Sequence, residues 1–293
     1  MRHASATIGA ILVVMFAGAC RAAPQPSEPA PRPAPAAEPA PVDPEPEPEP
    51  ERWPEPELEL EQIAGVHYLE VVTGDADADA ELPMVVALHG NGAFPRLMEA
   101  ALLQNPGDAE HPAAPYDAPA RFIFLRGTEA VDPPGHARWF SITANEAQAS
   151  AEQLAELSAQ IEARSNTVAD AIAALTEARP TVGKPIITGH SQGGILTFGL
   201  AVSHPEQFAA AFPVAGWLPA PLWPKQPANE VARKLRIVAL HGADDTTVSF
   251  IESEAAVEAL AKLGYDITLH PYPGVRHSFS PMLAELRALL ERA

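Results

Sequence analysis

The stretch from Pro185 to Ala201 constrains the fold of this chain more than any other. It reads PIITGHSQGGILTFGLA, in which two apolar runs flank a glycine-rich corner, and this predicts a strand, a sharp turn and a helix. Gly189 to Gly193 spells G-x-S-x-G, the nucleophile-elbow pattern, which lifts a serine onto a strained turn at the start of the helix. The glycines suit this turn because strand and helix backbones crowd together there. A lone G-x-S-x-G also fits a glycine-rich corner with an incidental Ser191, so other residues must decide.

The chain from Gly65 onward alternates apolar runs with amphipathic segments, the pattern of an α/β domain. A long helix is expected over Asn145–Arg179, where apolar residues recur three, four or seven positions apart, with a candidate break at Ser165-Asn166. The proline-dense stretch Trp217–Asn229 is too short for a separate lid domain. Strands are expected near residues 65–72, 83–89, 121–126, 184–189, 209–214, 235–240 and 267–272.

The first 19 residues are typical of a secretory signal peptide: Arg2 precedes an apolar run that is too short to span a membrane. Ala17-Gly18-Ala19 then leads directly into Cys20, the single cysteine. This order resembles the lipobox of bacterial lipoproteins, and it also fits ordinary signal-peptide cleavage. We therefore expect an exported protein that is lipid-anchored in the cell envelope through Cys20, and otherwise periplasmic or secreted. One cysteine forms no internal disulfide, so the core alone must stabilise the exported domain.

Residues 20–62 are expected to form a spacer, because Pro, Ala and Glu dominate them and cannot bury a core. Proline favours an extended conformation that spans on the order of 130 Å at about 3.1 Å per residue. The whole chain carries a net charge of −19, of which residues 21–62 contribute −8. The domain expected over 63–293 therefore carries −12 once Arg2 is counted, which argues against nucleic acid as a partner.

Two downstream segments could supply the partners that a nucleophilic serine needs, a base and an acid that orients it. The run from His241 to Asp245 follows an expected strand and offers Asp244 and Asp245 as acids. His277 lies in a loop before the last expected helix. Taken alone, His277 fits a surface loop and either aspartate fits a helix cap. The order Ser, Asp, His after successive strands instead predicts a catalytic triad.

A glycine-rich turn, His89-Gly90-Asn91-Gly92, follows the apolar run Met84–Leu88 of the strand expected near residues 83–89. Glycines in such a turn let backbone N–H groups point at a developing negative charge, so the amides of Asn91 and Gln192 are the expected oxyanion-hole donors. An ordinary glycine turn is the alternative. His89 and His190 are expected to pack beneath the site and take no part in the chemistry.

The pair Trp139-Phe140 follows the strand expected over 121–126. Its two aromatic side chains are candidates for lining the substrate pocket, and ordinary core packing is an equal alternative. No cluster of Cys or His has the spacing of metal ligands, so neither a metal nor another cofactor is expected.

Four motifs together resemble the phospholipase/carboxylesterase group of α/β hydrolases, which includes small bacterial carboxylesterases and acyl-protein thioesterases. The resemblance spans roughly residues 65–293 and implies a mostly parallel central sheet with helices on both faces and no large cap. It implies Ser191 as nucleophile, His277 as base and Asp245 as acid, because Asp245 fills the fifth position of H-G-x-x-D. The motifs are Leu88-His89-Gly90-x-Gly92, Gly189-His190-Ser191-Gln192-Gly193-Gly194, His241-Gly242-x-x-Asp245-x-x-Val248 and Gly274-x-x-His277-Ser278.

The resemblance implies a serine hydrolase that cleaves a small-molecule or lipid carboxylic ester through an acyl-enzyme intermediate. An exported depolymerase or feruloyl-type esterase acting on polymer esters is one alternative. A hydrolase-like domain that binds without turnover is another, and the complete set of catalytic motifs argues against it because binding does not require them.

Overall fold

The computed structural model describes residues 60–141 and 149–293. The chain divides into a unit of residues 1–50 and a unit of residues 51–293, and the second contains everything described below. The expected signal peptide, Cys20 and the spacer as far as residue 59 lie outside the described residues, as do the first residues of the helix expected from Asn145. Strand β1 (Glu61–Ile63) includes the last two residues of the expected spacer.

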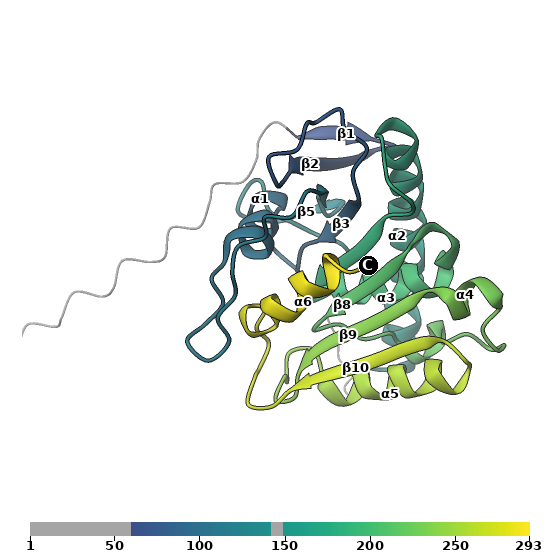
Figure 1. The fold of residues 1–293 in the computed structure, drawn as a ribbon. Helices are drawn as coiled ribbons and strands as arrows, with labels where there is room; N and C mark the ends of the chain where they lie inside the picture. The colour runs from purple at the N-terminus through teal and green to yellow at the C-terminus, as the bar shows by residue number, and fades with distance from the viewer. Residues whose placement is uncertain (1–59, 142–148) are drawn as a thin grey trace, which may run out of the picture. The chain divides into compact units, whose positions relative to one another are not determined.

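An eight-stranded sheet forms the centre of the domain, in the order β1-β2-β4-β3-β7-β8-β9-β10 (Figure 1). β1 and β2 (Val66–Val72) run antiparallel at one edge, and the other strands are parallel to one another. The prediction of a mostly parallel sheet is confirmed. The parallel strands are β3 (Met84–Leu88), β4 (Arg121–Leu125), β7 (Ile186–His190), β8 (Ala210–Val214), β9 (Arg236–Gly242) and β10 (Asp266–Tyr272).

Helices cover both faces of this sheet, as the fold class requires. Successive residues of β3 point to opposite faces: Val86 belongs to the core shared with α2 (Ala151–Ala178), α3 (Gln192–Ser203) and α5 (Phe250–Lys262). Val85 belongs to the second core, which contains residues of α1 (Pro95–Glu99), the π-helix η1 (Ala100–Gln104) and α6 (Leu283–Leu290). Burial on both faces explains why β3, β4 and β8 are apolar runs without alternation.

Short elements complete the domain. A two-stranded ribbon joins β5 (Glu129–Ala130) to β6 (Ala137–Arg138), and α4 (Glu230–Lys234) precedes β9. The 3₁₀ turns within the described residues are η3 (Pro205–Gln207), η4 (Ala220–Leu222) and η5 (Ser280–Met282). Among the described residues no insertion forms a large cap, and the proline-dense stretch contains only η4.

The long helix α2 is continuous, so the expected break at Ser165-Asn166 is wrong. Ser150 caps its first turn in a capping box with Gln153. Ser165 lies where α2 passes α3: a Cβ on Gly199 would stand 2.7 Å from the Ser165 hydroxyl oxygen. The small side chains at this position therefore allow two helices to approach closely.

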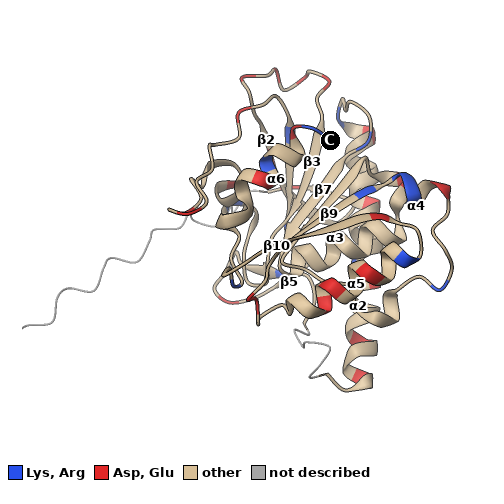
Figure 2. Cartoon of the chain, turned by 60° about the horizontal axis from the view of Figure 1, so that its bottom comes forward, with Lys and Arg blue, Asp and Glu red and all other residues tan. Residues whose placement is uncertain are grey.

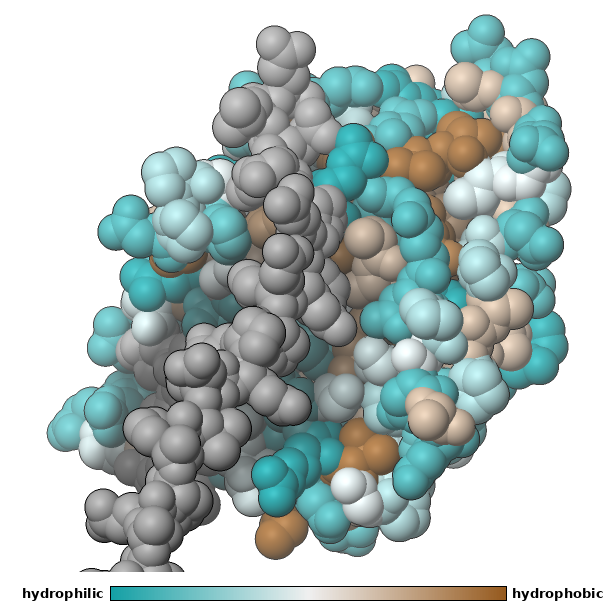
Figure 3. Space-filling model, turned by 90° about the vertical axis from the view of Figure 1, so that its left-hand side faces the viewer, coloured by the Kyte–Doolittle hydropathy of each residue, from teal (hydrophilic) through white to brown (hydrophobic). Residues whose placement is uncertain are grey.

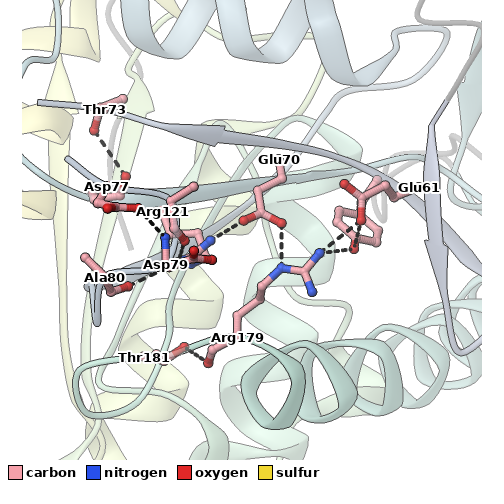
Figure 4. A network of polar contacts seen from close by, with 12 residues as sticks. Glu61, Glu70, Thr73, Asp77, Asp79, Ala80, Arg121, Arg179 and Thr181 are labelled. Atoms are coloured by element: carbon pink, nitrogen blue, oxygen red, sulfur yellow. Dashed lines mark hydrogen bonds and ion pairs between the residues drawn. The ribbon is translucent and has the colours of Figure 1, made fainter. Parts of the chain in front are cut away.

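A polar network fixes the antiparallel edge of the sheet (Figure 4). Glu70 of β2 pairs with the buried Arg121 and, at 2.8 Å, with Arg179, which follows α2. Arg121 also donates to the carbonyl oxygens of Ala78 and Ala80, at 2.7 and 3.2 Å. These contacts join β2 and β4 to the loop before β3 and to the end of α2.

The described surface is acidic and carries few large apolar groups. Figure 2 marks acidic residues along α2 and α5 and basic residues at α4. The exposed large apolar residues, Val182, Val231 and Ile251, lie apart in the sequence, and the apolar atoms visible in Figure 3 lie in separate groups. Within the described part of the chain, no helix has the length and apolar character needed to cross a bilayer.

Candidate active site

Ser191 occupies the tight corner between β7 and α3. Its φ of 57° and ψ of −118° lie in a region that non-glycine residues rarely adopt. The Ser191 N–H donates to the Val214 carbonyl at 3.0 Å, which fastens the corner to the neighbouring strand. A Cβ on Gly193 would stand 2.1 Å from the Leu88 carbonyl oxygen, and one on Gly189 would stand 2.5 Å from that of Gly193. Glycine is therefore required on both sides of the serine.

The structure brings Ser191, His277 and Asp245 into one hydrogen-bonded chain. The Ser191 Oγ lies 3.0 Å from His277 Nε2, and His277 Nδ1 lies 2.7 Å from Asp245 Oδ2. Because the carboxylate only accepts, the neutral imidazole carries its proton on Nδ1. Nε2 is then free to accept the serine proton.

Asp245 is held by donors on both of its carboxylate oxygens. Its Oδ1 accepts from the backbone N–H groups of Thr247 and Val248, at 2.9 and 3.0 Å. Burial alone would raise the pKa of this carboxyl. Hydrogen bonds from His241, His277 and Val248, with the charge of His277, outweigh burial and hold the pKa well below its ordinary value. Asp245 is therefore ionised beside His277 at neutral pH.

The neighbouring aspartate and histidine of the same motif have different positions. Asp244 is exposed, and its backbone N–H donates to Val275. His241 is buried, with Nε2 at 2.9 Å from the Val248 carbonyl oxygen and 3.3 Å from Asp245 Oδ2. The geometry thus separates the two aspartates that the local sequence left open.

The turn after β3 lies beside the nucleophile, since a Cβ on Gly90 would stand 3.4 Å from that of Ser191. The Gly127 N–H donates to His89 Nε2 at 2.9 Å, so His89 carries its proton on Nδ1, which lies 2.7 Å from the Gly90 carbonyl oxygen. Burial lowers the pKa of His89 to about 4, which keeps the ring neutral. Because C=O and N–H point in opposite directions across a trans peptide, this bond turns the Asn91 N–H away from His89.

Of the two alternatives for Trp139 and Phe140, the structure favours core packing over lining of the substrate pocket. Their exposed fractions are 0% and 1%, and both belong to the core. Trp139 Nε1 donates to the His89 carbonyl oxygen at 2.8 Å, and the Trp139 N–H donates to Gln192 Oε1 at 3.0 Å. Gln192 Nε2 in turn donates to the Phe140 carbonyl oxygen at 3.0 Å. The pair therefore links the turn after β3 to the first residue of α3.

A pocket of about 480 Å³ opens at Ser191. Its described lining contains no Lys, Arg, Asp or Glu, and its apolar side comes from the loop after β3, α1, η1 and the loop after β10. The sequence pattern gave no indication of these wall residues, because they belong to no motif. The apolar wall residues are Ala93, Leu97, Met98, Ala101 and Phe279.

His190 lines this pocket instead of lying wholly beneath it. Its ring centroid is 5.0 Å from that of His277 and 5.2 Å from that of Phe279. Burial, together with the charge of His277, lowers the pKa of His190 to about 3, so its ring stays neutral. Its buried Nε2 has no hydrogen-bond partner.

No group of three or more His, Cys, Asp or Glu side chains within residues 60–141 and 149–293 is arranged to hold a metal ion.

Two curated proteins are similar to parts of this chain. A probable carboxylesterase SOBER1-like protein of Arabidopsis thaliana is 35% identical over 94 residues, which are 32% of this chain and 36% of that protein. Acyl-protein thioesterase 1 of Gibberella zeae is 28% identical over 36% of this chain and 47% of that protein. The matches thus span between a third and a half of these relatives.

Two solved structures share the fold. Esterase PE8 superposes with a TM-score of 0.59 at 20% identity, over 78% of this chain and 98% of that one. The Bacillus cereus carboxylesterase superposes with a TM-score of 0.57 at 18% identity, over 78% and 95%. The model of the family described as Phospholipase/Carboxylesterase matches residues 68–291. The chain therefore belongs to the phospholipase/carboxylesterase family of α/β hydrolases.

Proposed function

We infer that this protein is a serine hydrolase that cleaves uncharged carboxylic esters through an acyl-enzyme intermediate. One observation carries the proposal: Ser191 stands on a strained elbow, bonded to His277 and through it to an ionised Asp245, at the mouth of a pocket. A binding domain would have no use for a serine held in this conformation beside a base, because the strain costs stability.

In the proposed first half-reaction, Ser191 Oγ attacks the ester carbonyl carbon while its proton passes to His277 Nε2. Asp245 stabilises the imidazolium that forms, since it is bonded to Nδ1 at 2.7 Å. The tetrahedral intermediate then collapses. Its C–O bond to the alcohol breaks, and the proton on Nε2 passes to the leaving oxygen, so a neutral alcohol departs and the acyl group remains on Ser191.

The negative oxygen of the intermediate needs hydrogen-bond donors already in place. The proposed donors are the backbone N–H groups of Asn91 and Gln192. Gln192 is the first residue of α3, where helix N–H groups have no partner within the helix. Asn91 lines the pocket, and its peptide is oriented by the His89 contact to Gly90.

The second half-reaction repeats these steps with water. His277 Nε2 takes a proton from water as its oxygen attacks the acyl carbon, and the proton then returns to Ser191 Oγ as the carboxylic acid leaves. The two half-reactions together consume one ester and one water and release one acid and one alcohol, and they need no further reactant.

The lining supports the substrate class. Because no Lys, Arg, Asp or Glu lines the pocket among the described residues, a charged group would be desolvated there without a partner. Esters with uncharged, mainly apolar chains avoid this cost.

The proposal is tested with p-nitrophenyl esters and a fluorophosphonate probe. The purified protein should hydrolyse the esters and be labelled at Ser191, while Ser191→Ala should keep its circular dichroism spectrum and lose both properties. Turnover by Ser191→Ala at the rate of the unsubstituted protein would refute the assignment of the nucleophile.

A further inference from the structure

The catalytic pocket adjoins a second pocket of about 410 Å³. The two share Ala101, Asn105 and Ser280 as lining residues. Asn105 Nδ2 donates to Ser280 Oγ at 3.1 Å, so a side-chain hydrogen bond spans the boundary between the pockets.

Asn105 is fixed in this position by other contacts. Its Oδ1 accepts the Gly107 N–H at 2.9 Å, which leaves Nδ2 facing Ser280. Its backbone N–H donates to the Ala100 carbonyl oxygen at 3.1 Å and ends the π-helix. The amide thus cannot rotate away from Ser280 without losing its bond to Gly107.

Arg287 of α6 holds the wall that carries Asn105. This buried guanidinium donates to the carbonyl oxygens of Leu102 and Asn105, at 2.8 and 2.9 Å, and also contacts that of Ala114. Two of its partners, the Leu102 and Asn105 carbonyl groups, lie in the last turn of η1 and just after it, where carbonyl groups lack partners within the helix. The hydrogen bonds from Arg287 therefore stabilise the backbone segment that places Asn105 at the boundary between the pockets.

The two sides of the boundary differ in chemistry. Of the residues at this boundary, the apolar Leu97 and Met98 line the catalytic pocket alone and the amide of Gln104 lines the second pocket alone, whereas Ala101 and Asn105 line both. An alkyl chain that crosses the boundary must separate Asn105 from Ser280, and it gives them no hydrogen bond in return. The bridge therefore favours chains that end before it.

We propose that the Asn105–Ser280 bridge sets the maximum length of the aliphatic chain in the substrate, and that the second pocket is an extension of the substrate site which this bridge closes. The inference rests on the proposed ester hydrolysis. It concerns an alkyl chain on either side of the ester bond, so acyl and alkoxy series are both measured.

The test compares chain-length profiles of kcat/KM for Ser280→Ala and Ser280→Leu. Ser280→Ala removes the acceptor and opens the boundary, so the optimum should move to longer chains. Each methylene that enters the second pocket should raise kcat/KM about fourfold, the equivalent of about 0.8 kcal/mol. Ser280→Leu fills the boundary with an apolar side chain, and its optimum should move to shorter chains.

Ser203→Ala is the matched control, because Ser203 is exposed near the end of α3 and bonds only locally, to the Gly199 carbonyl oxygen at 2.7 Å. Its profile should equal that of the unsubstituted protein. Opposite shifts in the two Ser280 variants, in either ester series, support the inference, and a general loss of stability would not produce them. Unchanged optima, or shifts in the same direction, overturn it.

The two proposals fail in different ways. If the unsubstituted protein turns over short esters and is labelled at Ser191 while the Ser280 profiles stay unchanged, only the bridge inference is wrong. If no ester is hydrolysed and no label is found, the proposed function is wrong.

Discussion

Replacing Trp139 with Phe separates two roles for this side chain, a structural link and a pocket wall. The change removes the indole N–H that donates to the His89 carbonyl oxygen at 2.8 Å. That oxygen would remain buried without its donor, which costs about 1–3 kcal/mol. The smaller ring also leaves a partial cavity, so the total loss in free energy of unfolding is about 2–4 kcal/mol.

The loss in stability should lower Tm by about 4–16 °C for a domain of this size. Activity should fall through kcat, because His89 and Gln192 flank the proposed oxyanion site and Trp139 contacts both. Complete loss of one oxyanion donor costs about 10²–10³ in kcat. A displaced donor should cost less, about 10- to 100-fold, with little change in KM.

Thermal unfolding and steady-state hydrolysis of a short p-nitrophenyl ester measure these effects. Trp223→Phe is the matched control, since its indole also donates to a carbonyl oxygen at 2.8 Å, but to that of Leu218 in the loop after β8 and not to one in the turn after β3. This control should lose stability and keep its kcat. An unchanged kcat with an altered KM or chain-length profile in Trp139→Phe would refute the structural link and restore the pocket role.

Further predictions concern the acid, the second histidine and the N-terminal segment. Asp245→Asn should lower kcat by about 10⁴-fold because it disrupts the hydrogen bond to His277. Asp244→Asn, at an exposed position, should lower kcat less than about tenfold. A larger loss of kcat in Asp244→Asn than in Asp245→Asn, measured on folded variants, would contradict the assignment of Asp245 as the acid. His190 has a pKa of about 3 in the folded state against about 6.5 when unfolded, so its contribution to stability is complete above pH 6.5 and is lost as the pH falls toward 3. The free energy of unfolding, measured in urea between pH 7 and 5, should therefore fall less steeply with decreasing pH in His190→Phe, by up to about 1.4 kcal/mol per pH unit. An equal pH dependence of this free energy in both proteins would be evidence against a buried neutral ring. We also propose that Cys20 is lipidated in a bacterial host; mass spectrometry of the N-terminus should find acyl chains that Cys20→Ala lacks, and an unmodified Cys20 in a soluble processed form would leave only the secreted alternative.

The sequence predicted the elements that local pattern controls. The apolar runs of β3, β4 and β8 are buried on both faces, so their composition alone indicates central strands. Ser191 could be predicted as the serine of the elbow because its strained corner requires glycine at positions 189 and 193, and both glycines are present in the sequence. The proposed role of His277 as the base could be predicted from the order Ser, Asp, His after successive strands.

Other features depend on contacts between distant residues. β1 has the acidic composition of the segment before it, and its strand depends on pairing with β2 and on the Glu61 contact to Tyr68. An aromatic pair after a strand suits a pocket or a core equally well. The bonds that place Trp139 in the core come from Gln192 and His89, about 50 residues away on either side.

The walls of the catalytic pocket were also beyond the reach of the sequence. Leu97 and Met98 are two apolar residues of the short helix α1. Their sequence does not distinguish side chains that line a substrate pocket from side chains that face the core. The bridge from Asn105 to Ser280 joins residues 175 positions apart, and residues of η5 and η1 share the same core on one face of the sheet.

The most direct test of the account is to trap the acyl group on the chain. The protein is mixed with an activated short-chain ester, quenched in acid within the first turnover, and digested for peptide mass spectrometry. The account predicts one acyl group, on the peptide that contains Ser191 and at that residue, together with a burst of alcohol equal to the enzyme concentration. Two results would contradict the account: an acyl group at a different residue, or hydrolysis by Ser191→Ala at the rate of the unsubstituted protein and without a burst.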